Sequence, residues 1–168
     1  GANSIRLAHY QHDNYFYELC DEKGVIVWAE IPYITIHMPT ARENTISQMK
    51  ELITQNYNHP SIICWALSNE ITLQGVTDDL IENHKILNDL VHEMDKSRLS
   101  AMANLFMLET DSPLITLPDL RGYNLYYGWY VGDVEDNDKW FDDFHKEHPN
   151  VAIGLTEYGA DSDRKSVV

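Results

Sequence analysis

The fold is decided by the stretch Ser61-Ile62-Ile63-Cys64-Trp65-Ala66-Leu67-Ser68-Asn69-Glu70, an apolar run that ends abruptly in an amide and a carboxylate. A short run of Ile, Cys, Trp and Leu between a proline and a polar tip is typical of a strand buried on both faces, as in a parallel sheet. If that sheet closes into a barrel, Glu70 lies at the carboxyl end of its strand. Barrels of alternating strands and helices carry out their chemistry at that end.

Alternation along the run predicts two different faces. Side chains of a strand point in turn to opposite sides, so counting back by twos from Glu70 separates small residues from bulky ones. One face holds Ser68, Ala66, Cys64 and Ile62, and the other holds Asn69, Leu67, Trp65 and Ile63. We therefore expect the small residues to line a crowded barrel interior and the bulky ones to meet an outer helix.

The rest of the chain alternates between strand and helix patterns. Strands are expected at 4–8, 25–31, 61–70, 99–103, 120–126 and 151–157. Helices are expected at 15–23, after the capping-box spacing at 40–43, over 78–94 and over 138–147, the first of them closed by Gly24. Six strands that alternate with helices predict βα units and a parallel sheet.

Composition limits the class of protein. A chain of 168 residues with 43% hydrophobic residues suits one domain with a substantial core. The net charge of −15 argues against nucleic acid or an anionic membrane as a partner. Cys20 and Cys64 both lie in apolar runs and are expected to be buried free thiols. We find no apolar stretch of transmembrane length and no signal peptide, so a cytoplasmic location is expected.

Two of the predicted strands end in a glutamate, Glu70 and Glu157. Carboxylates at the ends of parallel strands converge on one cavity at the barrel rim. A pair of carboxylates is the equipment for glycoside hydrolysis, because one donates a proton to the leaving oxygen while the other meets the anomeric centre. Glutamates are common at the surface, however, and each of these two could equally be a solvated residue at a loop end.

The residues around the two glutamates favour a carbohydrate. The neighbouring loops and strand ends supply Arg6, His9, Tyr10, Asn69, Trp129 and Tyr158. Aromatic rings and neutral hydrogen-bonding groups suit a sugar, which presents apolar faces and many hydroxyls. We therefore expect a carbohydrate substrate.

Five motifs, spread in order along the chain, carry a family resemblance. They are Arg6-Leu7-Ala8-His9-Tyr10, the segments 19–32 and 58–70, Asn124-Leu125-Tyr126-Tyr127-Gly128-Trp129-Tyr130, and Thr156-Glu157-Tyr158-Gly159. Together they resemble the catalytic domain of glycoside hydrolase family 2, over nearly all of residues 1–168. The resemblance implies a (β/α)8 TIM barrel and a retaining exo-glycosidase in which Glu70 is the general acid/base and Glu157 the nucleophile.

Further site residues follow from these roles. The charge of Arg6 would favour the ionised form of Glu157, and the Tyr126 hydroxyl could donate a hydrogen bond to it. In a retaining enzyme the carboxyl groups of Glu70 and Glu157 should lie about 5 to 5.5 Å apart.

Arg6 and Tyr126 are also expected to bind substrate, and four more residues are candidates for holding it. Asn69 and Asn124 are placed to bind substrate hydroxyls. His9 could do the same, although a histidine after a strand is about as often a structural hydrogen-bond partner. Trp129 could stack on the sugar or belong to the core.

No metal or cofactor is predicted. Some β-galactosidases of this family bind a divalent metal through a Glu-x-His after the third strand, but the positions aligned from Glu30 are Ile34 and Ile36 here, and His37 is one residue out of step. The acidic run at 133–138 lacks the glycine and the terminal glutamate of a calcium loop, so a solvated loop is expected.

The resemblance covers only part of a barrel. A (β/α)8 barrel needs about 250 residues, and the motifs place this chain between the second and seventh strands, with about six of eight βα units. We expect an incomplete barrel with open sheet edges, through which copies of the chain could associate.

Three functions stay open on the sequence. The first is hydrolysis of terminal β-galactosides, since most of the motifs resemble bacterial β-galactosidases. The second is hydrolysis of β-glucuronides or β-mannosides, because the tyrosine-rich segment resembles β-glucuronidases. The third is an inactive, truncated fragment that binds sugar without turnover.

Overall fold

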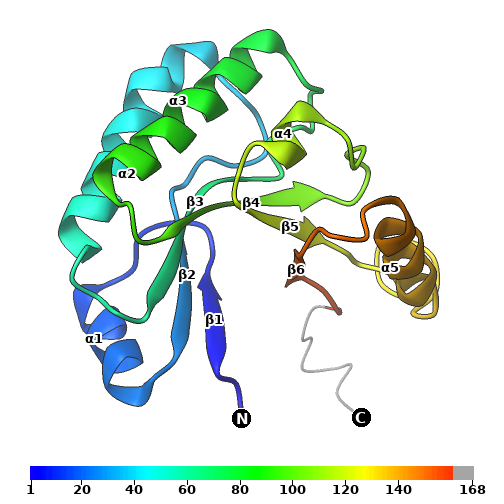
Figure 1. The fold of residues 1–168 in the computed structure, drawn as a ribbon, viewed down its shortest axis with the longest axis horizontal. Helices are drawn as coiled ribbons and strands as arrows, with labels where there is room; N and C mark the ends of the chain where they lie inside the picture. Colours follow the sequence, from blue (N-terminus) through cyan, green and yellow to red (C-terminus); the bar gives the residue numbers. More distant parts are fainter. Residues whose placement is uncertain (161–168) are drawn as a thin grey trace.

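The structure, a computed structural model, describes residues 1–160, which form six parallel strands alternating with helices (Figure 1). The strands are β1 (Ser4–Leu7), β2 (Ile26–Glu30), β3 (Ile62–Asn69), β4 (Leu99–Leu105), β5 (Leu120–Asn124) and β6 (Ile153–Glu157). The helices are α1 (Asn14–Lys23), α2 (Arg42–Asn56), α3 (Asp78–Met94), α4 (Pro113–Thr116) and α5 (Asp136–Glu147), with a 3-10 turn, η1 (Pro39–Ala41), before α2.

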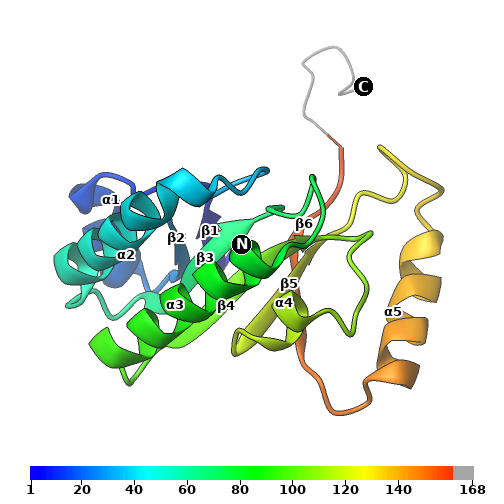
Figure 2. The same ribbon diagram turned by 90° about the horizontal axis from the view of Figure 1, so that it is seen from above.

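Strand order shows how the chain advances. Each strand pairs in parallel with the next, in the order β1-β2-β3-β4-β5-β6. The chain therefore moves around the sheet in one direction, as in a barrel, and does not reverse at a switch point. Figure 1 shows the sheet curved into half of a barrel with the helices on its outer side, and Figure 2 shows α2 and α3 side by side across it. The predicted incomplete TIM barrel is confirmed.

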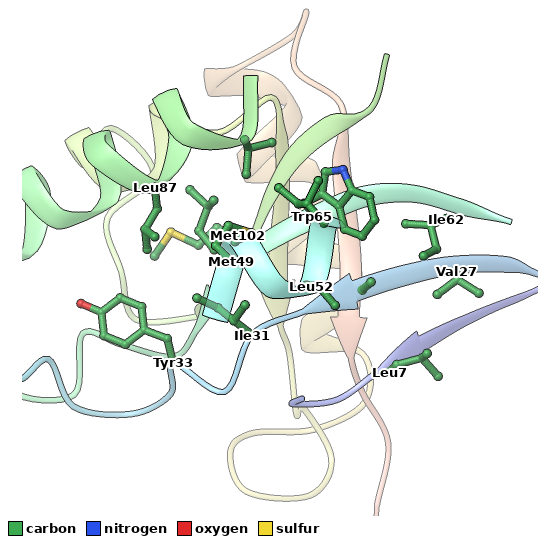
Figure 3. Packing of buried hydrophobic residues seen from close by; sticks show 14 of the residues in the cluster. Leu7, Val27, Ile31, Tyr33, Met49, Leu52, Ile62, Trp65, Leu87 and Met102 are labelled. Carbon is green, nitrogen blue, oxygen red and sulfur yellow. The ribbon is translucent and has the colours of Figure 1, made fainter. Parts of the chain in front are cut away.

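The main core lies between the sheet and helices α2 and α3 (Figure 3). Trp65 and Leu67 of β3 contribute to it from the sheet, and Met49 and Leu52 of α2 and Leu87 of α3 from the helices. All five side chains are buried, and burying a large apolar side chain contributes about 1.5 to 3 kcal/mol. This layer holds β3 rigidly, and β3 carries Asn69 and Glu70 at its end.

The middle of β3 follows the predicted alternation. Cys64 and Ala66 face the concave side, where they pack with Ala101 and Ala103 of β4 and with Trp28 of β2. The small residues thus line the interior and the bulky ones meet the helices. Both cysteines are buried free thiols, as expected.

At both ends of β3 the predicted faces are wrong. The pairing of β3 with β2 and with β4 shifts register, and each irregularity moves the alternation by one residue. Ile62 therefore joins the outer core, while Ile63 lines the concave side. Ser68 hydrogen-bonds His84 of α3, and Asn69 turns toward the interior, where its side chain meets that of Arg6.

Local sequence signals fix most helix ends. The Asp13 side chain accepts from the backbone of Tyr15 at the start of α1, and Gly24 closes that helix at φ 67°, where glycine is favoured. The Thr77 side chain caps α3 in the same way. Among the described residues no helix is long and apolar enough to span a membrane.

Two helix predictions need correction. The capping box at 40–43 does not form, because Pro39 starts the 3-10 turn η1 and takes Thr40 into it; α2 then begins at Arg42 without a side-chain cap. The short helix α4, which starts at Pro113, was not predicted, since a single turn leaves no helical periodicity to detect.

Candidate active site

Polar residues gather at the carboxyl ends of the strands. The last residues of β2, β3, β5 and β6 are Glu30, Asn69, Asn124 and Glu157, and Glu70 follows β3 directly. Parallel strands in one sheet bring these ends to one rim. Arg6 reaches this rim from β1 and contacts three of the other strands.

The Arg6 guanidinium is fully engaged by the protein. Its Nε and Nη2 donate to the two carboxylate oxygens of Glu30 at 2.8 and 3.0 Å. Its Nη1 donates to Glu157 Oε1 at 2.6 Å and to the Thr156 carbonyl at 3.5 Å, and Nη2 also donates to Asn69 Oδ1 at 2.8 Å. A guanidinium has five N–H donors, so none is left for a substrate. Arg6 was predicted to bind substrate; its contacts are those of a residue that positions other groups.

Glu30 is a member of the cluster that sequence reasoning missed. Its side chain is 1% exposed, and its oxygens accept from Arg6, from His9 Nδ1 at 2.6 Å and from Trp28 Nε1 at 2.9 Å. The signal was available, because Glu30 ends a strand just as Glu157 does. The predicted strand 25–31 ran on to Ile31, so Glu30 was not counted among the strand ends.

His9 turns one ring nitrogen to Glu30 and the other toward Glu157. A carboxylate only accepts, so the short Nδ1 contact to Glu30 places a proton on Nδ1. Nε2 lies 3.9 Å from Glu157 Oε1, beyond hydrogen-bond distance. In the neutral ring this nitrogen can therefore accept a hydrogen bond from a ligand.

Glu70 is held by backbone and amide contacts. Its φ of 48° lies in the left-handed region, a conformation that costs a non-glycine residue about 1 to 3 kcal/mol. Its N–H donates to the Ala103 carbonyl at 2.9 Å. Asn124 Nδ2 donates to Glu70 Oε1 at 2.8 Å and to Asn69 Oδ1 at 3.1 Å. The structure thus fixes where this carboxyl group points.

Two amides differ in what they can offer a substrate. Asn124 uses both N–H groups on Asn69 and Glu70, and its Oδ1 accepts from Thr156 Oγ1 at 2.7 Å. The Asn69 oxygen is also taken, but within residues 1–160 its Nδ2 has no hydrogen-bond partner. Of these two predicted hydroxyl-binding residues, Asn69 has donors available and Asn124 does not.

Glu157 lies between a cation and a phenol. Arg6 donates to its Oε1, and the Tyr126 hydroxyl donates to its Oε2, which is the contact expected from the sequence. Burial raises the pKa of Tyr126 above its usual range, and the hydrogen bond to Glu157 and the charges of Glu157 and Glu70 raise it further. Asn124, which donates to Glu70 and accepts from Thr156 next to Glu157, links the two carboxylates at one part of the rim.

An aromatic group lies in the loop after β5. Tyr126 and Tyr130 meet edge to face at 5.1 Å, and Tyr130 contacts Trp129 in the same manner at 5.8 Å. Trp129 is 47% exposed, so it is not a core residue. In the described part of the chain its side chain makes no hydrogen bond to the clustered carboxylates. Tyr10 and Tyr158 are also exposed at the rim.

His37 serves a structural contact. Its Nδ1 hydrogen-bonds the Tyr33 hydroxyl at 2.5 Å and its Nε2 pairs with Asp79 at 2.6 Å, so both nitrogens are occupied. Within the described residues no group of three or more His, Cys, Asp or Glu side chains could hold a metal ion. The predicted lack of a metal site and of a cofactor remains a prediction.

Comparison with known proteins adds independent information. The chain matches the family model "Glycosyl hydrolases family 2, TIM barrel domain" over residues 1–165. A β-glucuronidase of Bacteroides fragilis is 38% identical over 95% of this chain and 24% of its own length. The crystal structure of an FMN-binding β-glucuronidase from Faecalibacterium prausnitzii L2-6 is 45% identical, with a TM-score of 0.94 over 97% of this chain and 26% of that one.

A provisionally assigned β-galactosidase from Bacteroides fragilis is also similar. Its structure is 37% identical to the chain, with a TM-score of 0.91 over 97% of this chain and 24% of that one. The chain therefore spans about a quarter of the length of each of these three proteins.

Proposed function

Because the chain belongs to glycosyl hydrolase family 2, we propose that it supplies the cleavage centre of an exo-acting β-glycosidase that retains anomeric configuration. One observation carries the proposal: two carboxylates share a rim but have different partners. Glu157 contacts the Arg6 cation, whereas Glu70 accepts from a neutral amide of Asn124. A carboxylate beside a cation suits the nucleophile, and one beside a neutral donor suits the group that exchanges a proton.

The roles give a two-step reaction. A Glu157 oxygen attacks the anomeric carbon as the bond from that carbon to the leaving oxygen breaks, and Glu70 gives its proton to that oxygen. Glu70, now a carboxylate, takes a proton from water. The water oxygen attacks the same carbon and displaces Glu157 as a free carboxylate. Two inversions at one carbon retain the configuration.

The remaining residues divide into substrate-binding and positioning groups. The free Nδ2 of Asn69 and Nε2 of His9 are suited to sugar hydroxyls, as donor and acceptor respectively. Arg6 and Asn124, whose donors are used within the protein, hold Glu157 and Glu70 in place. Trp129 and Tyr130 offer exposed aromatic surface for the sugar or its leaving group.

The names of two relatives favour a β-glucuronide as the sugar. Both the curated relative and the more similar solved structure are called β-glucuronidases. A uronate carboxylate calls for a cationic partner, and Arg6 has no free donor. We infer that a cationic partner for a uronate lies elsewhere than at Arg6. The β-galactoside expected from the sequence is the second candidate, on the name of the other solved structure.

A direct test uses the complete gene product. Nitrophenyl β-glucuronide, β-galactoside and β-mannoside should be compared for kcat/KM, and NMR of the fresh product should show the β-anomer first. Sugar binding without hydrolysis by residues 1–168 alone would instead support the inactive-fragment alternative, and an α-anomer from the complete gene product would exclude retention.

Substitutions separate the two glutamates. Glu157→Gln should lower turnover by orders of magnitude, because within the cluster no other carboxylate is proposed to attack the anomeric carbon. Glu70→Gln should still release nitrophenol in the first step, which needs little proton donation, but should hydrolyse the intermediate slowly. Azide, which needs no base, should rescue Glu70→Gln with retained configuration. If azide instead rescued Glu157→Gln with retained configuration, the roles of the two glutamates would be exchanged.

A further inference from the structure

We propose that Glu30 is a positioning residue: it holds Arg6 against the nucleophile and fixes the proton of His9 so that the open ring nitrogen faces the substrate. The inference rests on the proposed function. Within residues 1–160 the Glu30 side chain hydrogen-bonds Arg6, His9 and Trp28, so its influence on Glu157 passes through Arg6 and His9.

Glu30 fixes the orientation of the Arg6 guanidinium. Glu30 takes two N–H groups of Arg6, which leaves the Nη1 edge of the guanidinium directed at Glu157. Trp28 Nε1 donates to Glu30 Oε2 at 2.9 Å, and this contact orients the carboxylate in turn. A charge that is 1% exposed and held by a bidentate pair and an indole has little freedom to move. Arg6 is therefore presented to Glu157 at a fixed angle.

Glu30 also determines which ring nitrogen of His9 carries the proton. Glu30 Oε1 lies 2.6 Å from His9 Nδ1, closer than the 3.3 Å from Nδ1 to Arg6 Nη2. Arg6 can only donate, so a proton on Nδ1 satisfies Glu30 and leaves Nε2 as the acceptor. Without the carboxylate, Arg6 would donate to Nδ1 and the proton would move to Nε2. The ring would then offer a substrate hydroxyl a donor instead of an acceptor.

Glu30 also changes the electrostatic environment of Glu157. The charged and titratable groups around Glu157 are Arg6 from β1, His9 from the following loop and Tyr126 from the segment after β5, and Glu70 reaches the same rim through Asn124. Arg6 forms ion pairs with both Glu30 and Glu157. If Glu30 becomes neutral, Arg6 no longer has a competing ion pair, and a negative charge near Glu157 is removed. The ionised form of Glu157 is then favoured further.

The test is the pH profile of Glu30→Gln in the complete gene product. The acid limb of kcat/KM, which reports ionisation of the nucleophile in the free enzyme, should move to lower pH by roughly one unit. The kcat should fall by roughly tenfold, with a smaller change in KM, because the nucleophile is held less well. Glu93→Gln on α3 is the matched control: it removes the same charge from an exposed side chain and should change neither value.

The pH profile, the kcat of the variants and the His9 tautomer can each refute the positioning role of Glu30. An acid limb in Glu30→Gln that coincides with the wild type, whatever the loss in stability, would overturn the positioning role. If Glu30→Gln fails to fold, Glu30→Asp keeps the charge but is too short for its contacts; it should lose kcat while the acid limb stays in place, and an unchanged kcat would refute the proposal. In the wild-type protein, 15N shifts should show His9 protonated at Nδ1, and the reverse tautomer would refute it independently. An inactive wild type would instead count against the proposed function, and the tautomer measurement would still apply to Glu30.

Discussion

The buried histidine behind β3 predicts a measurable dependence of stability on pH. His84 of α3 is fully buried; its Nδ1–H donates to the Leu80 carbonyl at 2.9 Å, and its Nε2 accepts from Ser68 Oγ at 2.7 Å. Burial lowers the pKa of His84 from 6.5 to about 4, and the nearby charge of His37 adds to this effect. Neutral His84 thereby fixes the part of β3 that leads into Asn69 and Glu70.

The sign and the size of this pH dependence follow from the linkage between protonation and folding. The unfolded chain binds a proton at this histidine below pH 6.5, whereas the folded chain does so only near pH 4. The contribution is therefore fully present above pH 6.5 and is lost as the pH falls toward 4. At 1.36 kcal/mol per pH unit the whole effect is roughly 3 kcal/mol, of which about 2 kcal/mol is lost between pH 7.5 and pH 5.

Urea unfolding at pH 7.5 and at pH 5, followed by tryptophan fluorescence, measures this loss. The matched variant is His84→Gln, whose amide does not titrate but can still accept from Ser68. Between the two pH values the wild type should lose about 2 kcal/mol more than the variant. Equal losses in the two proteins would show that His84 is not held neutral by burial, and the reasoning would fail.

Two further predictions concern the sheet. Arg98→Ala should lower the free energy of unfolding by about 3 to 5 kcal/mol, because it leaves the buried Asp95 carboxylate without its cation; a urea-measured loss below about 1 kcal/mol would contradict this. Gly122→Ala should reduce both stability and turnover, since its Cβ would lie 2.5 Å from Thr156 Cγ2, next to the proposed nucleophile. Gly154→Ala, whose Cβ would find its nearest neighbour at 3.7 Å, is the control and should be tolerated.

Sequence reasoning succeeded where a pattern was long and regular. The apolar run of β3 predicted a buried parallel strand, and the contrast of Cys64 and Ala66 with Trp65 and Leu67 predicted which face meets the helices. It failed at the ends of the strand, because a register irregularity depends on the neighbouring strands and leaves no trace in the alternation. The orientation of Ser68 and Asn69 was wrong for that reason.

Only part of the candidate site could be predicted from the sequence, for a related reason. The positions of Glu70 and Glu157 at the rim follow from strand ends, which a sequence displays. The sequence does not show which hydrogen-bond donors remain free, because this depends on how the ends of five strands converge. The contacts that occupy the donors of Arg6 and Asn124 therefore could not be predicted from the sequence. Glu30 was overlooked because the predicted strand extended to Ile31, one residue beyond the observed end of β2.

The central claim is that Glu157 forms a bond to the sugar. A glycoside of whichever sugar is hydrolysed, with fluorine at C2 and an activated leaving group, destabilises the positively charged transition state and slows the second step, so the glycosyl-enzyme should accumulate. Mass spectrometry of the digested protein should then find the added fluorosugar on the peptide that contains Glu157, and Glu157→Gln should remain unlabelled. Label on Glu70, or turnover by the wild type without any covalent label, would contradict the account.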